Sequence, residues 1–192
     1  METCPDIKLN IGSGPLKFDG FLNVDYDDNF NPDYLLDIGR DTWPWADNTV
    51  SQVKAYHVLE HLGDPDFFHC LKELYRVCKP DAEVEVLVPQ HRHDVFLNDP
   101  THRRPITIDG MNLFSKEYNR YCDTIGDHAS QLGYYFNVDF KIVDFNFNID
   151  AAYQPLIQKI KPGSLEEKEF QMAIRERNNI VVEVRFLWKV IK

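Results

Sequence analysis

Alternating apolar and polar positions recur along the chain and predict short β-strands. Segments such as "IKLNI" and "EVEVLVP" change polarity at nearly every residue, which places alternate side chains on opposite faces of a sheet. Glycine, proline or aspartate, the residues that favour turns, follow most of these segments. The predicted strands cover residues 7–11, 21–27, 34–38, 51–57 and 82–89. Two longer alternating segments, residues 135–148 and 180–191, predict two further strands.

Apolar residues at helical spacing predict a helix that starts at Asp64 and ends before Pro80. The aspartate suits the N-cap, and the proline that follows it suits the first helical position. A second helical segment starts at Ser115 and continues with breaks to about residue 131, with Gly133 as its stop signal. This order of elements favours an α/β fold with a mostly parallel sheet, and the final two strands are expected at one edge.

Two segments lie outside this regular pattern. Residues 90–113 contain prolines and several charges without periodicity, and loops of that length are usually functional or disordered. They are expected to form a substrate-side loop. Residues 150–179 separate the last two strands, and Ser164 with Glu167 forms a capping box for a helix there. The whole chain is therefore interpreted as a single domain with a helical insertion between its last two strands.

Charge and length narrow the function classes. The chain has 192 residues and a formal net charge of −10, which repels phosphate backbones and disfavours nucleic acid as a partner. A small-molecule or sugar substrate is expected instead. No apolar run reaches the roughly 18 residues that a membrane span needs, so no membrane partner is expected. The N-terminal segment lacks the basic start and apolar core of a signal peptide, which favours a cytoplasmic location. The oligomeric state stays open.

The cysteines provide no metal-binding pattern. Cys4, Cys70, Cys78 and Cys122 form no Cys-x-x-Cys pair, so a structural zinc site is disfavoured. Cys70 and Cys78 fall within one helical pattern and are interpreted as buried thiols. Free thiols fit a reducing cytoplasm.

The candidate ligand-binding motif is a glycine turn followed by two acids. Gly12-Ser13-Gly14 ends the first strand, and its glycines allow a tight turn close to a ligand. Asp25 ends the second strand, where an acid can bind ribose hydroxyls. Only 11 residues separate Gly14 and Asp25, against the usual 20 or so, which leaves little room for a phosphate-binding helix. Asp37 is a candidate for the adenine amino group, with a solvated loop acid as the alternative.

The segment "YHVLEH" raises a competing possibility. His57 and His61 are four residues apart with Glu60 between them, the spacing of an inverted zinc-protease motif. Such a motif needs a helix to place both imidazoles on one face. The preceding residues are predicted to form a strand, and Gly63 stops any helix just beyond. A zinc hydrolase is therefore disfavoured, and no metal ion is expected.

The combined pattern is more informative. "LNIGSGPLKFDGFLNVDYD", "DYLLDI", "PWADNTVSQVKAYHVLEHL" and "LKELYRVCKPDAEVEVLVP" resemble the class I S-adenosylmethionine-dependent methyltransferases, in particular a compact branch with a shortened first helix. The resemblance covers residues 7–89 and extends more loosely to residue 114. It implies a Rossmann-like sheet in the order 3-2-1-4-5-7-6 with the seventh strand antiparallel, and S-adenosylmethionine as cofactor.

The resemblance also implies roles for residues. Gly12, Ser13 and Gly14 would lie beneath the methionine part of the cofactor and Asp25 would hold the ribose. The adenine would contact Asp37 and Ile38. Residues 57–61, starting with His57, would line the site of the transferable methyl group.

Transfer to an oxygen or nitrogen acceptor needs positioning, and an oxygen acceptor must also lose its proton. A histidine suits that role near neutral pH, and His57, His61 and His102 are the candidates, with Glu60 able to orient one of them. For each histidine, a packed or solvated imidazole remains the alternative. A catalytically silent binding or scaffold protein is the second functional hypothesis, because a fold does not prove activity.

Overall fold

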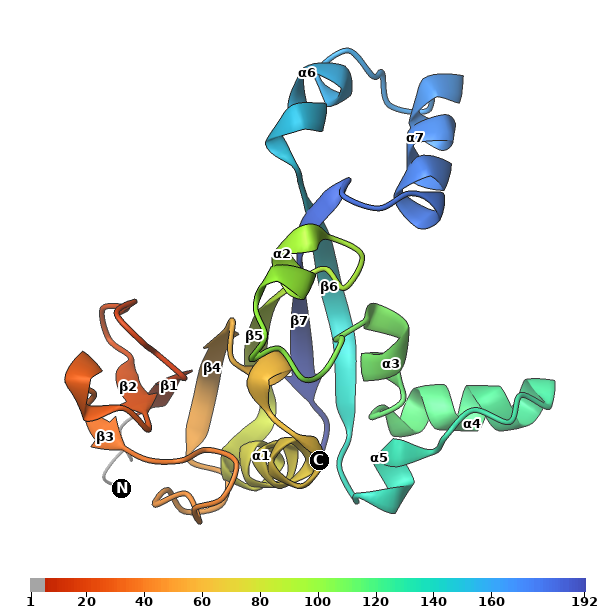
Figure 1. The fold of residues 1–192 in the computed structure, drawn as a ribbon. Helices are drawn as coiled ribbons and strands as arrows, with labels where there is room; N and C mark the ends of the chain where they lie inside the picture. Colours follow the sequence, from red (N-terminus) through yellow and green to blue (C-terminus); the bar gives the residue numbers. More distant parts are fainter. Residues whose placement is uncertain (1–5) are drawn as a thin grey trace.

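Seven strands of the computed structural model, which describes residues 6–192, form one sheet in the order β3-β2-β1-β4-β5-β7-β6 (Figure 1). β7 is antiparallel to β5 and β6, and the other neighbouring pairs are parallel. The order and the antiparallel seventh strand that the resemblance implied are both confirmed. The strands are β1 (Ile7–Ile11), β2 (Leu22–Asp25), β3 (Tyr34–Leu35), β4 (Val50–Tyr56), β5 (Cys78–Pro89), β6 (Phe140–Ile149) and β7 (Val181–Val190).

Short helices connect most of these strands. They are η1 (Asp28–Phe30), η2 (Leu59–His61), α1 (Asp64–Val77), α2 (Asp94–Asn98), α3 (Ile108–Asn112), α4 (Lys116–Ile125), α5 (Leu132–Tyr135), η3 (Ala151–Tyr153), α6 (Gln154–Ile157) and α7 (Leu165–Glu176). α1 lies across one face of the sheet, and its apolar residues join the core formed by Val53, Val84 and Phe186 (Figure 1). No helix of the described residues is both long enough and apolar enough to cross a membrane.

The opposite face of the sheet has little helical cover. In a right-handed topology, the crossovers from β1 to β2 and β3 lie on the face opposite to the β4–β5 crossover. Here those connections contain only the single turn η1. Phe18 takes the place of a helix, because its ring lies 5.5 Å from that of Tyr56 and 4.9 Å from Nζ of Lys54. This absence of a first helix agrees with the short spacing between the glycine turn and Asp25.

The uncovered face also carries a row of charges. Lys54 contacts Glu85 at 2.5 Å, and Glu85 also contacts Arg185 at 2.5 Å. Arg185 continues the row to Asp144 at 3.1 Å. These residues come from four neighbouring strands, β4, β5, β7 and β6. Charged pairing therefore stabilises the face that the missing helices leave open.

Two predicted helix boundaries were wrong. The N-cap of α1 is Gly63, so Asp64 is already helical and makes no capping hydrogen bond. α4 begins after its Ser115 cap as predicted, but it ends at Ile125, where the following Gly126 has φ +70°. Gly133 does not stop a helix; it is buried within α5, where a β carbon would lie 2.8 Å from Oδ1 of Asn119. Close packing, and not backbone conformation, explains that glycine.

Strand lengths also differ from the sequence pattern. The second strand was predicted for residues 21–27 and the third for residues 34–38, but β2 and β3 are shorter. β5 starts four residues earlier than predicted, because Cys78 already pairs with Val50. The helix pattern and the strand overlap at this point, so periodicity alone did not separate them.

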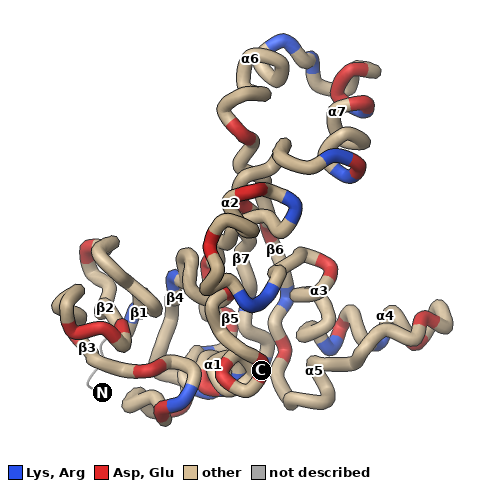
Figure 2. Tube along the Cα trace, viewed as in Figure 1, with Lys and Arg blue, Asp and Glu red and all other residues tan. Residues whose placement is uncertain are grey.

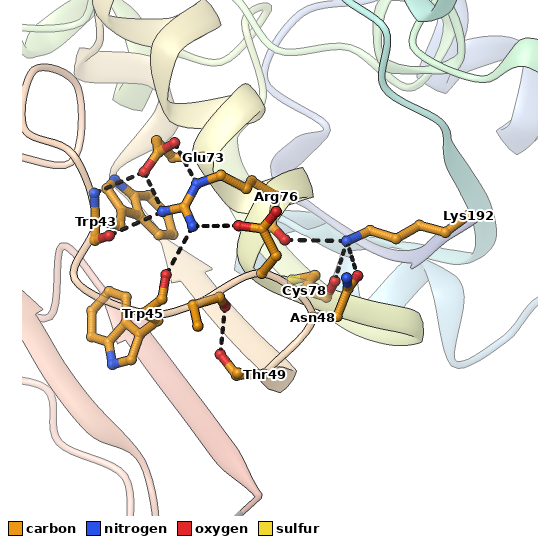
Figure 3. A network of polar contacts seen from close by, with 10 residues as sticks. Trp43, Trp45, Asn48, Thr49, Glu73, Arg76, Cys78 and Lys192 are labelled. Atoms are coloured by element: carbon orange, nitrogen blue, oxygen red, sulfur yellow. Dashed lines mark hydrogen bonds and ion pairs between the residues drawn. The ribbon is translucent and has the colours of Figure 1, made fainter. Parts of the chain in front are cut away.

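One polar network holds the connection between β3 and β4 against α1 (Figure 3). The guanidinium of Arg76 donates to the carbonyl oxygens of Trp43 and Trp45, to Asp47 and to Glu73, at 2.7–3.0 Å. Glu73 also accepts a hydrogen bond from the backbone N–H of Trp43 at 2.8 Å. Both tryptophans are buried. The network therefore fixes the segment that follows the predicted adenine-binding residues.

The two irregular segments meet at the carboxyl edge of the sheet. β6 is parallel to β5, so its end at Ile149 lies at the same edge as the ends of β1 and β4, and α6 and α7 rise from there (Figure 1). His93 of the 90–113 segment contacts Asp150 at 3.2 Å, and the backbone N–H of Asp94 donates to Asn179 at 2.8 Å. Ser164 caps α7 as predicted, but Glu167 returns to the N–H of Gly163 and not to that of Ser164.

Candidate functional site

The glycine turn at the end of β1 has the backbone that its sequence suggested. Gly12 and Gly14 adopt left-handed conformations, with φ of +60° and +47°. A β carbon at Gly12 would lie 2.3 Å from Cγ2 of Val58, so the turn packs directly against the segment that follows β4. Ser13 is buried, and its N–H donates to the carbonyl of Val24 at 3.0 Å. Two predicted parts of the site, the turn and residues 57–61, are thus adjacent.

Asp25 is buried and binds the glycine turn. Its Oδ2 accepts a hydrogen bond from the N–H of Gly14 at 2.7 Å, and its Oδ1 accepts one from Asp27 at 3.0 Å. A carboxylate has about four lone-pair positions, so each oxygen can still accept one further hydrogen bond. Asp25 therefore links β2 to the turn and keeps capacity to bind a hydroxyl group.

Asp37 and Ile38 differ in their surroundings. The Asp37 side chain is 40% exposed; its Oδ1 accepts a hydrogen bond from Gly39 at 3.0 Å and its Oδ2 lies 3.8 Å from Nε of Arg40. Ile38 is buried in the core, and its carbonyl accepts a hydrogen bond from the Trp43 indole at 3.1 Å. Asp37 is accessible to a ligand, whereas Ile38 contributes mainly to the packing beneath that position.

His57 directly follows β4 in a left-handed conformation with φ +51°, which is uncommon for a residue other than glycine. Both of its ring nitrogens face carboxylates: Nδ1 lies 3.5 Å from Oε1 of Glu60, and Nε2 lies 3.0 Å from Oε1 of Glu183. The Glu60 carboxylate raises the pKa of His57, although partial burial opposes this, and Glu183 raises it further. Strained backbone positions held by their surroundings are frequent at functional sites.

His61 and His102 lie together, in contacts separate from those of His57. Their ring centroids are 4.8 Å apart, and η2 holds His61 in a single turn of 3-10 helix. The backbone N–H groups of Arg103 and Arg104 donate to the carbonyl of Glu60, which anchors the loop beside η2. The structure therefore brings His102 of the 90–113 segment next to residues 57–61. The "YHVLEH" segment contains no α-helix, so His57 and His61 do not share a helical face.

Glu183 was not recognised from the sequence. It lies opposite Pro89 in the antiparallel pairing of β5 and β7, which carries it to the carboxyl edge of β4 and β5. Its Oε2 also accepts a hydrogen bond from Asn148 at 2.8 Å. The only signal in the sequence was a charged residue at the start of an apolar strand, and its position depends on strand register.

Comparison with solved structures identifies the architecture. A S-adenosylmethionine-dependent methyltransferase from Archaeoglobus fulgidus superimposes with a TM-score of 0.61 at 16% identity, over 96% of this chain and 86% of that one. This is the fold of the class I methyltransferases. A geranyl diphosphate C-methyltransferase from Streptomyces coelicolor A3(2), solved with Mg²⁺, geranyl diphosphate and S-adenosylhomocysteine, gives 0.50 at 11% identity, over 97% and 71% of the chains.

The class I methyltransferase fold is also found in a structure described as a [4+2]-cyclase. That protein, SpnF, gives a TM-score of 0.53 at 13% identity, over 97% of this chain and 76% of that one. No protein-family model matches the sequence, and no curated protein matches it. At these identities the likeness establishes the fold, and the chemistry has to be argued from the site.

Proposed function

We propose that the protein is a S-adenosylmethionine-dependent methyltransferase acting at an oxygen or nitrogen of a small-molecule or sugar acceptor. The observation that carries this proposal is the hydrogen bond from Gly14 to Asp25, which joins the glycine turn to the acid of β2 at 2.7 Å. In an open α/β sheet, ligands bind at the carboxyl ends of the strands, where this pair lies. A nucleoside without a pyrophosphate fits a turn that opens no helix.

We assign each portion of the cofactor to the residues that would contact it. Gly12, Ser13 and Gly14 would contact the methionine portion, Asp25 the ribose, and Asp37 the adenine amino group above buried Ile38. When bound, the cofactor supplies an activated methyl group. The protein's contribution is then to orient the acceptor and exclude water around the reacting atoms.

His57 is the residue we assign to the acceptor's proton. It directly follows β4 in the segment that packs on the glycine turn through Val58. Glu183, 3.0 Å from Nε2, would hold the proton on that nitrogen, so Nδ1, which lies 3.5 Å from Glu60 and beyond good hydrogen-bond distance, would keep the lone pair that takes the acceptor's proton. His61 and His102 lie next to each other in a separate contact, which favours His57 among the three candidates.

Charge and thiol chemistry support the choice of acceptor and compartment. Acidic residues gather around β2 and β3, whereas acidic and basic residues are mixed on the α6–α7 insertion (Figure 2). An acidic field near the cofactor edge disfavours a polyphosphate acceptor such as nucleic acid. Cys70, Cys78 and Cys122 are buried free thiols, which fits a cytoplasmic protein, while Cys4 lies outside the described residues.

Transfer of a labelled methyl group tests the enzymatic part of the proposal. Wild type is incubated with labelled S-adenosylmethionine and a panel of hydroxyl and amine acceptors, alongside His57→Gln and Glu183→Gln. We expect transfer by wild type and a loss of about 10²-fold or more in His57→Gln, the usual range for a general base. Cofactor binding without transfer to any acceptor would instead favour the silent scaffold.

A further inference from the structure

The side chains of Glu60, His61 and His102 form a cluster in which the methyl-transfer proposal gives no role to either histidine. One candidate ligand atom from each residue lies within 4.8 Å of those from the other two. We propose that these three residues bind a divalent first-row transition-metal ion, with zinc as the reference ion. The site differs from the inverted motif considered for the sequence, because it pairs His61 with His102 and not with His57.

Glu60 provides the first observation that a cation belongs here. Glu60 is 0% exposed, and neither of its carboxylate oxygens accepts a hydrogen bond from any described residue. The nearest polar group with a known distance, Nδ1 of His57, is 3.5 Å away, which is long for a hydrogen bond. Burying a carboxylate without partners costs several kcal/mol, roughly, unless a charge compensates it. A metal ion bound to the free oxygens would supply that charge.

Hydrogen bonding fixes the tautomer of His102. Its Nδ1 lies 2.7 Å from the carbonyl oxygen of Phe96, which can only accept, so Nδ1 carries the proton. In the neutral ring, Nε2 then keeps its lone pair. Metal-binding histidines characteristically donate their other ring N–H to a carbonyl or carboxylate in this manner.

The same reasoning applies to His61. The hydroxyl of Thr101 donates its hydrogen to Oδ1 of Asp99 at 2.6 Å, so it accepts a hydrogen bond from Nδ1 of His61 at 2.9 Å. Nε2 of His61 is therefore left with the lone pair. The Asp99–Thr101–His61 chain orients this ring, as a carboxylate commonly orients a histidine ligand through an intermediate group.

Ligand type and geometry indicate the class of ion. Two imidazoles and one carboxylate suit zinc and neighbouring divalent metals, whereas calcium and magnesium prefer oxygen ligands alone. Bonds of about 2.0–2.2 Å place tetrahedral ligands roughly 3.3–3.6 Å apart. Metal binding would need the three atoms, now within 4.8 Å of one another, to draw together by rotation of the half-buried His61 ring, since the His102 side chain is only 8% exposed. Three protein ligands leave a fourth position for water or another oxygen.

Metal titration of the full chain tests the proposal. Chelator-treated protein is titrated with Co²⁺, followed by absorption, and then with Zn²⁺ in competition. We expect one equivalent of Co²⁺ with the strong visible bands of low coordination number, displaced by one equivalent of Zn²⁺. His61→Ala and His102→Ala should each weaken zinc binding at least about tenfold, a loss that even supporting residues of metal sites can produce.

His128→Ala is the matched control, because His128 is exposed in the loop after α4 and forms no hydrogen bond with the described residues. It should bind zinc as wild type does. Circular dichroism checks that every variant is folded, and half-buried His61 provides a second test if His102→Ala does not fold. Absence of saturable binding, or equal binding by wild type and the two histidine variants, would overturn the proposal. The outcome does not depend on whether the protein binds S-adenosylmethionine.

Discussion

Gly12 lies so close to Val58 that a β carbon at position 12 would come within 2.3 Å of Val58 Cγ2. The contact joins two segments far apart in the sequence, the glycine turn after β1 and the turn after β4. It explains why position 12 requires glycine for two reasons, the left-handed backbone and the absence of space. Gly14 shares only the first reason, because no atom lies within 4 Å of the position of its β carbon.

Alanine substitutions at these two glycines should therefore lower the free energy of unfolding by unequal amounts. Gly14→Ala should cost about 1 kcal/mol, the strain of a left-handed alanine. Gly12→Ala should cost about 2–4 kcal/mol, because overpacking against Val58 adds to the same strain. Urea unfolding of both variants measures the difference. Equal destabilisation would contradict the close contact between the glycine turn and Val58.

Replacing Arg76 with lysine should lower the free energy of unfolding even though the positive charge is kept. Arg76→Lys keeps the positive charge but removes the planar fork that reaches two backbone carbonyls and two carboxylates (Figure 3). We expect a decrease of about 2–3 kcal/mol in the free energy of unfolding, since buried acceptors lose their donors. Arg40→Lys serves as the control, because Arg40 is 71% exposed and should change stability by less than about 0.5 kcal/mol. Similar unfolding of Arg76→Lys and wild type would show that the network is not needed.

The lowered pKa of Glu85 should make the free energy of unfolding depend on pH. Burial disfavours its charged form, but hydrogen bonds from Lys54, Tyr56 and Arg185 outweigh this and lower its pKa from 4.5 to about 2. Because the folded-state pKa is the lower one, its stabilising effect is complete above about pH 4.5 and is lost as the pH falls toward 2. The contribution at neutral pH is about 3 kcal/mol.

Unfolding of wild type and Glu85→Gln at pH 6 and at pH 3 checks this dependence. The difference in stability between the two proteins should shrink at the lower pH. Glu83→Gln is the control, since Glu83 lies two positions earlier on the same strand and forms no ion pair with described residues. A difference that stays constant with pH would contradict the role assigned to the Lys54–Glu85–Arg185 row.

The sequence predicted the parts of the molecule that depend on local pattern. Strand positions followed from alternation, and the order of the sheet followed from a resemblance carried by the glycine turn and Asp25. Ser115 and Ser164 were found because capping is a short-range interaction. Gly133 was misread for the opposite reason, because its small size serves packing against Asn119, a contact that no local pattern reveals.

The less predictable features depend on long-range register and on side-chain placement. Glu183 reaches His57 only because β7 pairs with β5 in one particular register. The approach of His102 to His61 depends on how the 90–113 segment folds back, since Arg103 and Arg104 bind the carbonyl of Glu60. Spacing in "YHVLEH" indicated a pair of histidines, whereas the folded chain groups His61 with a residue 41 positions later.

Calorimetric titration of wild type, Asp25→Asn and Asp28→Asn with S-adenosylhomocysteine tests whether the glycine turn and Asp25 bind the cofactor. We expect wild type to bind with a dissociation constant on the order of micromolar. Asp25→Asn should weaken binding by about tenfold or more, because a hydrogen bond to a charged acceptor is lost. Asp28→Asn, an exposed acid three residues away, should bind like wild type. No binding to wild type, or equal binding by all three proteins, would contradict the assignment of the cofactor site.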